Sequence, residues 1–393
     1  YIILEDFDRF QVDFERSFFN QSGTSGYLAN GLKIYPLLVI FLGLQCLLNA
    51  NIFGQANTPK YSNEFLNIGV GARSLGMGST GVSFVDDVTA AYWNPAGLLR
   101  MQPTHQIAAM HSSYFGGLAN YDYVGLATTL EDDGVLSLSA IRFSVDDIPD
   151  TRFLVDATGA INYDNIQFFS SADYSFLLSY ARELPFLGGI QTGGNLKVIY
   201  RTVGEFSTAW GFGLDIGAQK KLGQWQFGAV LRDVFGTFNA WSHNVEEFEE
   251  IYALAGNDIP VNTLEVTLPR LIIGAARKFD IAQNFSLLTS LDMDVTSDGR
   301  RNTIIKSELF SIDPKAGAEF GYKNAAFIRF GASQMQQIKD FDGSTSWTVQ
   351  PNAGVGFKIR ELSIDYALTD IGDLAPGLFS HVFSLKVDFN AKD

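Results

Sequence analysis

The sequence predicts an all-β protein: a transmembrane antiparallel β-barrel of about fourteen strands with an N-terminal hatch, or plug. Three observations lead to this prediction. Segments of about ten residues alternate between apolar and polar side chains, which is typical of barrel strands. The connections between these segments alternate between short and long. The residues before the first segment do not alternate and are rich in glycine.

The last segments show the alternation most clearly. In residues 381–389, Phe383, Leu385 and Val387 alternate with Ser384 and Lys386. The same pattern extends over segments 106–116, 121–130, 135–146, 174–183, 190–203, 207–221, 224–232, 267–279, 284–295, 314–322, 325–333, 347–358, 361–370 and 380–389. A water-soluble β-sandwich alternates equally well, so the connections must separate the two folds.

The long connections fall only on every second joint, at residues 147–173, 233–266, 296–313, 334–346 and 371–379. Outer-membrane barrels have short periplasmic turns and longer external loops, and an even strand count returns both termini to the periplasm. A soluble sandwich gives no reason for this parity. The connections therefore favour the barrel.

The barrel also explains why charged residues occur inside alternating segments. Arg or Lys on the lipid face near the middle of the membrane costs about 2 to 4 kcal/mol, so Lys197 and Arg201 are expected to face the lumen. The alternation assigns a further set of small and polar residues to the lumen: Gly213, Asp215, Gly217 and Gln219.

The bulk composition excludes several classes of function. The chain has 393 residues, of which 18% are charged, and a net charge of −15, which disfavours binding to nucleic acid or to anionic lipid. Cys46 is the only cysteine, so no disulfide is available. The histidines lack metal-ligand spacing, and we expect no cofactor, no metal and no enzymatic activity.

The N-terminal region predicts export. The uncharged run 34–56 follows Lys33 and ends with the small residues Gly54 and Ala56, which is typical of a secretory signal peptide over residues 32–56. A membrane anchor needs about 20 strongly apolar residues and is disfavoured because Pro36 and Gln45 interrupt the run. The mature protein is expected in a bacterial outer membrane, in contact with its lipid.

Residues 1–31 have the wrong charge for the start of a signal peptide, because acidic residues outnumber basic ones. No methionine precedes Met77. We therefore interpret residues 1–31 as an upstream extension, with translation beginning at Leu32 through an alternative start codon. The expected division is then extension 1–31, signal peptide 32–56, hatch 57–105 and barrel 106–389.

The hatch contains a dense block of glycine, charged and Asn-Pro residues, namely Gly71, Arg73, Gly76, Gly78, Asp86, Asp87, Trp93, Asn94, Pro95, Ala96 and Gly97. This block resembles the start of PorV/PorQ family proteins, which are relatives of the FadL long-chain fatty-acid channels. The resemblance implies a fourteen-stranded barrel that serves in, or beside, the type IX secretion system. Its implied partners are the translocon and exported proteins.

The same residues have a simple structural interpretation. Proline restricts the preceding Asn94 to extended conformations, and the Asn side chain holds the turn. Asp86 and Asp87 are suited to accept hydrogen bonds from loop amides or from Arg73. We expect this block to shape the hatch rather than to contact a ligand.

Two other patterns are weaker. Gly76, Gly78 and Gly81 match the dinucleotide fingerprint, but no strand precedes them and no helix start follows. Asp292, Asp294 and Asp298 resemble a calcium loop that lacks its glycine and one ligand, so a strand end and turn is favoured.

One external loop is predicted to carry a helix. Asn244 and Glu247 form a capping box, and an apolar face follows that includes Phe248, Ile251 and Tyr252. This face either packs on the barrel rim or contacts a partner or ligand.

Two functions from different classes remain. The first is a protein-interaction or carrier component of type IX protein secretion. The second is a FadL-like channel for the uptake of hydrophobic small molecules. The small, polar residues assigned to the lumen favour the first.

Overall fold

The computed structural model describes residues 62–155, 159–185, 188–246, 261–307, 309–339, 343–369 and 379–390. The predicted extension, the signal peptide and the first residues of the hatch lie outside these ranges, as do Phe248, Ile251 and Tyr252 of the predicted loop helix. Among the described residues, no helix has the length and apolar character needed to cross a membrane.

Strands make up most of the described chain. In order they are β1 (His105–Tyr114), β2 (Ala119–Thr129), β3 (Val135–Asp150), β4 (Gln167–Leu184), β5 (Ile190–Val203), β6 (Ser207–Leu222), β7 (Trp225–Arg232), β8 (Thr237–His243), β9 (Thr263–Thr267), β10 (Arg270–Ala282), β11 (Phe285–Thr296), β12 (Ile305–Lys306), β13 (Ser311–Tyr322), β14 (Ala326–Lys339), β15 (Thr345–Ile359), β16 (Leu362–Thr369) and β17 (Ser380–Phe389). Short 3₁₀ turns, η3 (Phe115–Gly117) and η4 (Tyr163–Asn165), lie in two connections.

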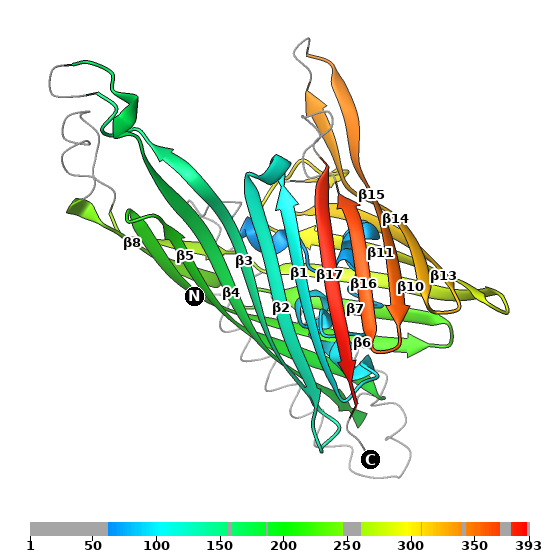
Figure 1. Cartoon of the computed structure of the whole chain (residues 1–393). Coiled ribbons are helices and arrows are strands. Elements are labelled where there is room, and N and C mark those ends of the chain that lie inside the picture. The colour runs from blue at the N-terminus through cyan, green and yellow to red at the C-terminus, as the bar shows by residue number, and fades with distance from the viewer. Residues whose placement is uncertain are drawn as a thin grey trace, which may run out of the picture. The chain divides into compact units, whose positions relative to one another are not determined.

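These strands form one closed antiparallel barrel (Figure 1). The pairing of β1 with β17, from His105↔Phe389 to Ser113↔His381, closes the wall. β7 and β8 both pair with β6 and are two parts of one wall strand. In the same way, β9 and β10 are two parts of the next wall strand. β12 is a short strand that pairs with β13. The chain therefore crosses the wall fourteen times, as the alternation predicts.

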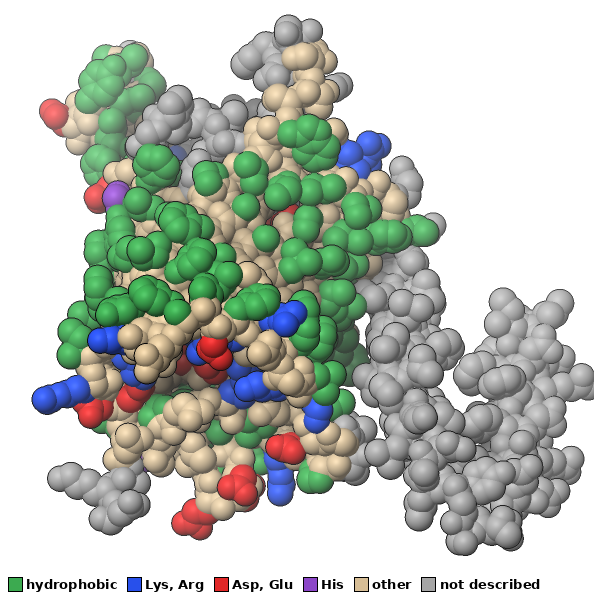
Figure 2. Space-filling view, turned by 90° about the vertical axis from the view of Figure 1, so that its right-hand side faces the viewer, with side chains coloured by type: hydrophobic (Ala, Val, Ile, Leu, Met, Phe, Trp, Pro, Cys, Tyr) green, Lys and Arg blue, Asp and Glu red, His purple; other side chains and the backbone are tan. Residues whose placement is uncertain are grey.

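The two faces of the wall differ sharply in polarity. In β5, the Lys197 side chain is 3% exposed and lies inside, where it pairs with Asp215 at 2.8 Å, whereas its neighbour Leu196 is 47% exposed. In β6, Phe212 and Ile216 lie outside. Figure 2 shows the result on one side of the barrel: a broad field of hydrophobic side chains, with charged side chains gathered below it. The outward face is thus suited to lipid.

Several of the predicted long loops are partly strand. The predicted loop 233–266 contains β8 and β9, so Phe238 and Trp241 belong to the wall. The chain bulges at Asp233 and Gly236, which have φ of 54° and 80°, and then resumes pairing with β6. The bulge interrupts the period of two, and this is why the prediction stopped at residue 232.

The predicted loops 147–173 and 334–346 are also too long, because the hairpins β3–β4 and β14–β15 extend into them and rise above the other strands (Figure 1). Both hairpins contain a register shift, between Val145 and Ile148 and between Ser333 and Gln336. After each shift, the apolar side chains occupy the other set of alternate positions. A prediction that requires an unbroken period of two therefore ends the strand at the shift.

The N-terminal segment fills the barrel. Residues 62–104, the described part of the hatch, form η1 (Glu64–Asn67), α4 (Ala72–Gly76), α5 (Ala90–Trp93) and η2 (Pro95–Arg100). Figure 1 shows these short blue helices within the ring of strands. Their apolar side chains, such as Val70, Leu75 and Leu98, are fully buried and form the hydrophobic core with inward-facing wall residues.

Candidate functional site

The Asn94–Pro95 turn is fastened to the wall at β6. Asn94 is fully buried and extended, with φ of −159°, as the following proline requires. Its side-chain amide donates to the carbonyl oxygen of Val82 at 2.8 Å and to that of Ala218 in β6 at 3.0 Å. Its oxygen accepts from the Ala96 amide at 3.2 Å, which caps η2, with Pro95 in the first turn. The turn therefore binds the hatch to the wall.

Glycines of the wall let the hatch lie directly against the strand backbone. A Cβ atom added at Gly193 of β5 would lie 2.6 Å from the Pro95 carbonyl carbon. The same close approach to the hatch, at 2.0 to 2.3 Å, recurs at wall glycines on four more strands, namely Gly217, Gly228, Gly317 and Gly331. Any side chain at these positions would overlap the hatch. We call these five residues the glycine belt.

Glycines of the hatch allow similarly close approaches to the wall and within the hatch. Gly78 has φ of 71°, and a Cβ there would lie 2.6 Å from the Ala316 carbonyl oxygen of β13. At Gly76 an added Cβ would lie 3.2 Å from the Gly354 Cα of β15. Gly97 leaves room for the Val85 carbonyl oxygen, 2.4 Å from an added Cβ. The glycines of the sequence block thus lie where the backbone is closely packed.

Arg73 joins the hatch to β13. Its guanidinium donates two hydrogen bonds to the Glu319 carboxylate, at 3.0 and 2.9 Å, and one to Asp86 at 3.2 Å. Its charge also lies 5.2 Å from the centre of the Phe84 ring. Glu319 receives a second cation from the wall, Arg329, at 2.6 Å. A bidentate Arg–carboxylate pair fixes orientation as well as distance, so α4 is held rigidly at this point.

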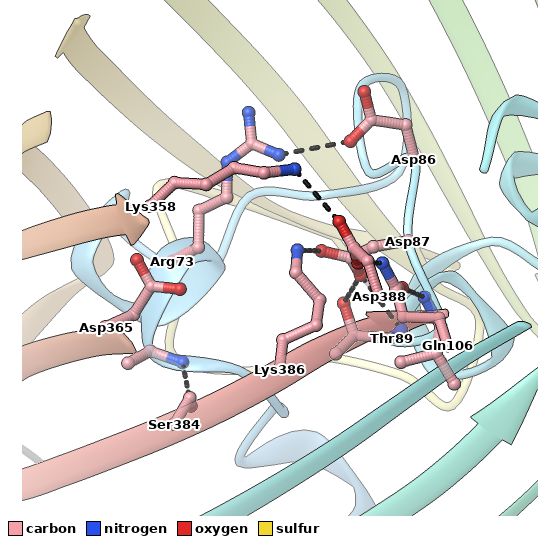
Figure 3. A network of polar contacts seen from close by, with 12 residues as sticks. Arg73, Asp86, Asp87, Thr89, Gln106, Lys358, Asp365, Ser384, Lys386 and Asp388 are labelled. Carbon is pink, nitrogen blue, oxygen red and sulfur yellow. Dashed lines mark hydrogen bonds and ion pairs between the residues drawn. The ribbon is translucent and has the colours of Figure 1, made fainter. Parts of the chain in front are cut away.

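Asp87 joins the hatch to the last strand. Figure 3 shows Lys386 rising from β17 toward the Asp87 carboxylate, with which it forms an ion pair. Asp87 also accepts from the Thr89 amide at 2.9 Å. Burial alone raises the pKa of Asp87, but the Lys386 ammonium and the hydrogen bonds outweigh burial and lower the pKa from 3.8 to about 2.

This lowered pKa predicts how the hatch responds to acid. Because the folded-state value lies below the ordinary one, the stabilisation is complete above pH 3.8 and is lost as the pH falls through about 2. The barrel in detergent should therefore keep its hatch protected from pepsin at about pH 4, whereas Asp87→Asn should be cleaved in the hatch at that pH. Cleavage of the parent protein at about pH 4 would contradict this.

The side chains that resemble a calcium loop serve the wall and the hatch. Asp292 and Asp294 lie in β11, and Asp292 accepts hydrogen bonds from the Gly81 and Val82 amides at 2.8 and 3.1 Å. Asp298 pairs with Arg301 at 2.6 Å. Within the described residues, no group of three or more His, Cys, Asp and Glu side chains is placed to hold a metal ion.

Two cavities lie on opposite sides of the hatch. At the end of the barrel with the long connections, a cavity of about 450 Å³ is lined mainly by polar side chains, among them Glu64, Arg270, Asp294 and Lys315. At the end where β1 begins and β17 ends, a cavity of about 250 Å³ contains Arg73, Asp86, Glu319, Lys358 and Asp388. We call these the outer and inner cavities. The hatch separates them.

The structure brings the block of hatch residues together, with Trp93 donating to the Val70 carbonyl oxygen at 2.8 Å inside it. Sequence reasoning missed their partners in the wall, which are Glu319, Arg329, Lys386 and the glycine belt. The sequence did contain a signal for these contacts. A charged residue or a glycine at a lumen-facing position of a strand indicates a contact with another group inside the barrel. The identity of that partner depends on the fold.

No protein-family model matches this chain, and no curated protein matches it either. Solved structures are similar over nearly their whole length. The CymD monoaromatic hydrocarbon channel is 14% identical, with 82% of this chain and 98% of that chain covered and a TM-score of 0.51. The toluene transporters TbuX of Ralstonia pickettii and TodX of P. putida are each 13% identical, with 82% of this chain and 99% of theirs covered and TM-scores of 0.50 and 0.51.

At this identity the similarity shows a shared fold. The three proteins are described as hydrocarbon or toluene channels and transporters, and none as a component of protein secretion. The fourteen-stranded barrel that the resemblance implies is therefore the fold that these structures share with this chain. The implied role in type IX secretion rests on the resemblance of the hatch residues alone.

Proposed function

We propose that the protein is an outer-membrane channel for small hydrophobic molecules, with the hatch as its barrier. One observation carries the proposal: a barrel of fourteen crossings with a filled lumen has the fold of three hydrocarbon or toluene channels over nearly their full length. The secretory signal in the sequence and the apolar outward face fit an outer-membrane location.

The polar lining of the outer cavity has a consequence for affinity. Burial of apolar surface contributes about 25 cal/mol per Å² only where the surroundings are apolar. Most of its lining residues are polar, but their apolar stems and the side chains of Ile68 and Leu75 also line it, so a hydrocarbon meets a mixed surface there. We infer that the outer cavity binds its ligand weakly and passes it on.

The test is toluene uptake by cells that make the barrel. We expect uptake above that of cells lacking the protein, and faster uptake when residues 62–104 are deleted from the exported chain. Equal uptake in all three strains, with the barrel present in the outer membrane, would refute the channel.

A second function is favoured by a specific feature, the hairpin β3–β4. It rises above the barrel and exposes Phe153, Tyr163 and Phe168, at 47, 72 and 65% of their surfaces. Exposed aromatic side chains of this kind are suited to protein contacts. They would serve a carrier component of type IX secretion, together with the apolar face proposed for Phe248, Ile251 and Tyr252.

Replacing Tyr163 and Phe168 with Asp separates the two functions. A secretion component should lose its co-purifying proteins, and exported proteins should accumulate in the periplasm. A channel should keep its toluene uptake, because the hairpin lies away from the hatch. Lost uptake with unchanged co-purification would place the hairpin in the channel instead.

A further inference from the structure

The contacts between the hatch and the wall are of two kinds, and they lie on different sides of the barrel. On β5, β6, β7, β13 and β14, the glycine belt brings backbone against hatch atoms. Strands β17 and β1 contain no glycine. The single glycine of β2, Gly125, faces Tyr123 and Ser139 of the wall. The second side therefore meets the hatch through side chains.

The polar contacts on the second side depend on side chains of the wall that can rotate. Ser384 of β17 accepts from the Ala72 amide at 2.8 Å, and the Met110 sulfur of β1 accepts from the Gly71 amide at 3.0 Å. Lys386 of β17 supplies the ion pair to Asp87. Rotation of a side chain costs little compared with movement of a strand, so this boundary is the easier one to open.

A small cavity already lies along this boundary. It has a volume of about 20 Å³, which is room for about one water molecule. Ala72, Val85, Ala108 and Met110 form the apolar part of its lining, and the charged side chains of Arg73, Asp87, Asp365 and Lys386 form the rest of it together with small polar residues. Its lining shares Asp87 and Lys386 with that of the inner cavity.

We propose that small molecules pass between the hatch and strands β17, β1 and β2, and that Lys386 gates this seam through its pair with Asp87. The hatch stays fixed to the glycine belt while the seam widens. The apolar part of the lining, from Ala72 and Val85 to Ala108 and Met110, suits a slim hydrophobic molecule such as toluene. This inference rests on the proposed channel function for its ligand, but not for the position of the seam.

Engineered disulfides test the position of the seam, since Cys46 is the only native cysteine and Cys46→Ser removes it. Ala72→Cys with Ser384→Cys would lock α4 to β17 across the seam. The matched control, Gly76→Cys with Ala367→Cys, locks the same helix to β16, where the two Cβ atoms would lie 3.5 Å apart. We expect oxidation to abolish toluene uptake for the first pair, reversibly with reductant, and to leave it for the second.

A charge variant tests the gate without a disulfide. Lys386→Met should raise the conductance of planar bilayers in potassium chloride severalfold. The control Lys220→Met removes a lysine that only donates to turn carbonyl oxygens, at 2.9 Å for Gly189, and should leave conductance unchanged.

The outcomes separate the two proposals. If both disulfides abolish uptake, or if oxidation of the seam pair leaves uptake intact, the seam is wrong. If Lys386→Met leaves conductance unchanged while deletion of the hatch raises it, the gate is wrong. If the barrel never carries toluene, the channel proposal fails, and conductance of Lys386→Met in potassium chloride still decides on the seam.

Discussion

Replacing Gly331 with alanine is expected to detach the hatch from the wall while the barrel stays closed. The added Cβ would lie 2.0 Å from the Gly78 nitrogen and 2.2 Å from the Met77 carbonyl carbon. Both are backbone atoms, so no rotamer change relieves the overlap. Overpacking of this kind costs about 1 to 3 kcal/mol per site. The wall itself keeps its hydrogen bonds, because they do not involve the side chain.

The release is measured by protease cleavage within residues 62–104 and by conductance in potassium chloride, both of which should rise. Adjacent residues of β5 give a matched control. Gly193→Ala overlaps Pro95 at 2.6 Å, whereas Gly194→Ala approaches only the Asp215 carbonyl oxygen, at 3.3 Å. The first should behave like Gly331→Ala and the second like the parent. Equal behaviour of the pair would show that the belt does not hold the hatch.

Glu319→Gln is expected to lower the stability of the barrel strongly. Glu319 is 5% exposed and balances two guanidinium groups, those of Arg73 and Arg329. Removal of one partner from a buried ion pair costs about 3 to 5 kcal/mol, because the remaining charge stays without compensation. The midpoint of heat-induced unfolding, read from the change in gel mobility on heating, should fall clearly.

Two further variants test whether the effect of Glu319→Gln comes from the loss of its buried ion pairs. Asp132→Asn removes an exposed carboxylate 3.9 Å from Arg182, a pair worth at most about 1 kcal/mol. Its midpoint should hardly move. The double change Arg73→Met with Glu319→Met removes both partners and should recover part of the loss, since Arg329 keeps Asp365 at 2.7 Å. A midpoint for Glu319→Gln equal to that of Asp132→Asn would contradict the role assigned to Arg73.

The wall was predictable from the sequence because a barrel strand repeats every two residues, and the predicted segments 190–203 and 380–389 coincide with β5 and β17. The errors occur at bulges, where one extra residue shifts the period. At Asp233 the prediction therefore ended a strand that resumes at Thr237.

The site was only half predictable. Asp86 and Arg73 belong to the same block of hatch residues and are in contact in the fold, so the sequence alone could predict their pairing. Lys386 lies far from Asp87 in the sequence. The alternation predicts only that the Lys386 side chain faces the lumen. The neighbour it finds there depends on closure of the barrel and on the depth to which the hatch enters.

The order of the hatch in the chain has a consequence for folding. The hatch is made first, yet its hydrogen bonds reach Glu319 and Ser384, across sequence separations of 246 and 312 residues. Contacts between residues so far apart in the sequence form late in folding, because the chain between them must be brought together before the contacts add stability. The hatch can complete its contacts only after β17 has formed, so assembly should pass through an intermediate in which residues 62–104 remain accessible to periplasmic chaperones and proteases.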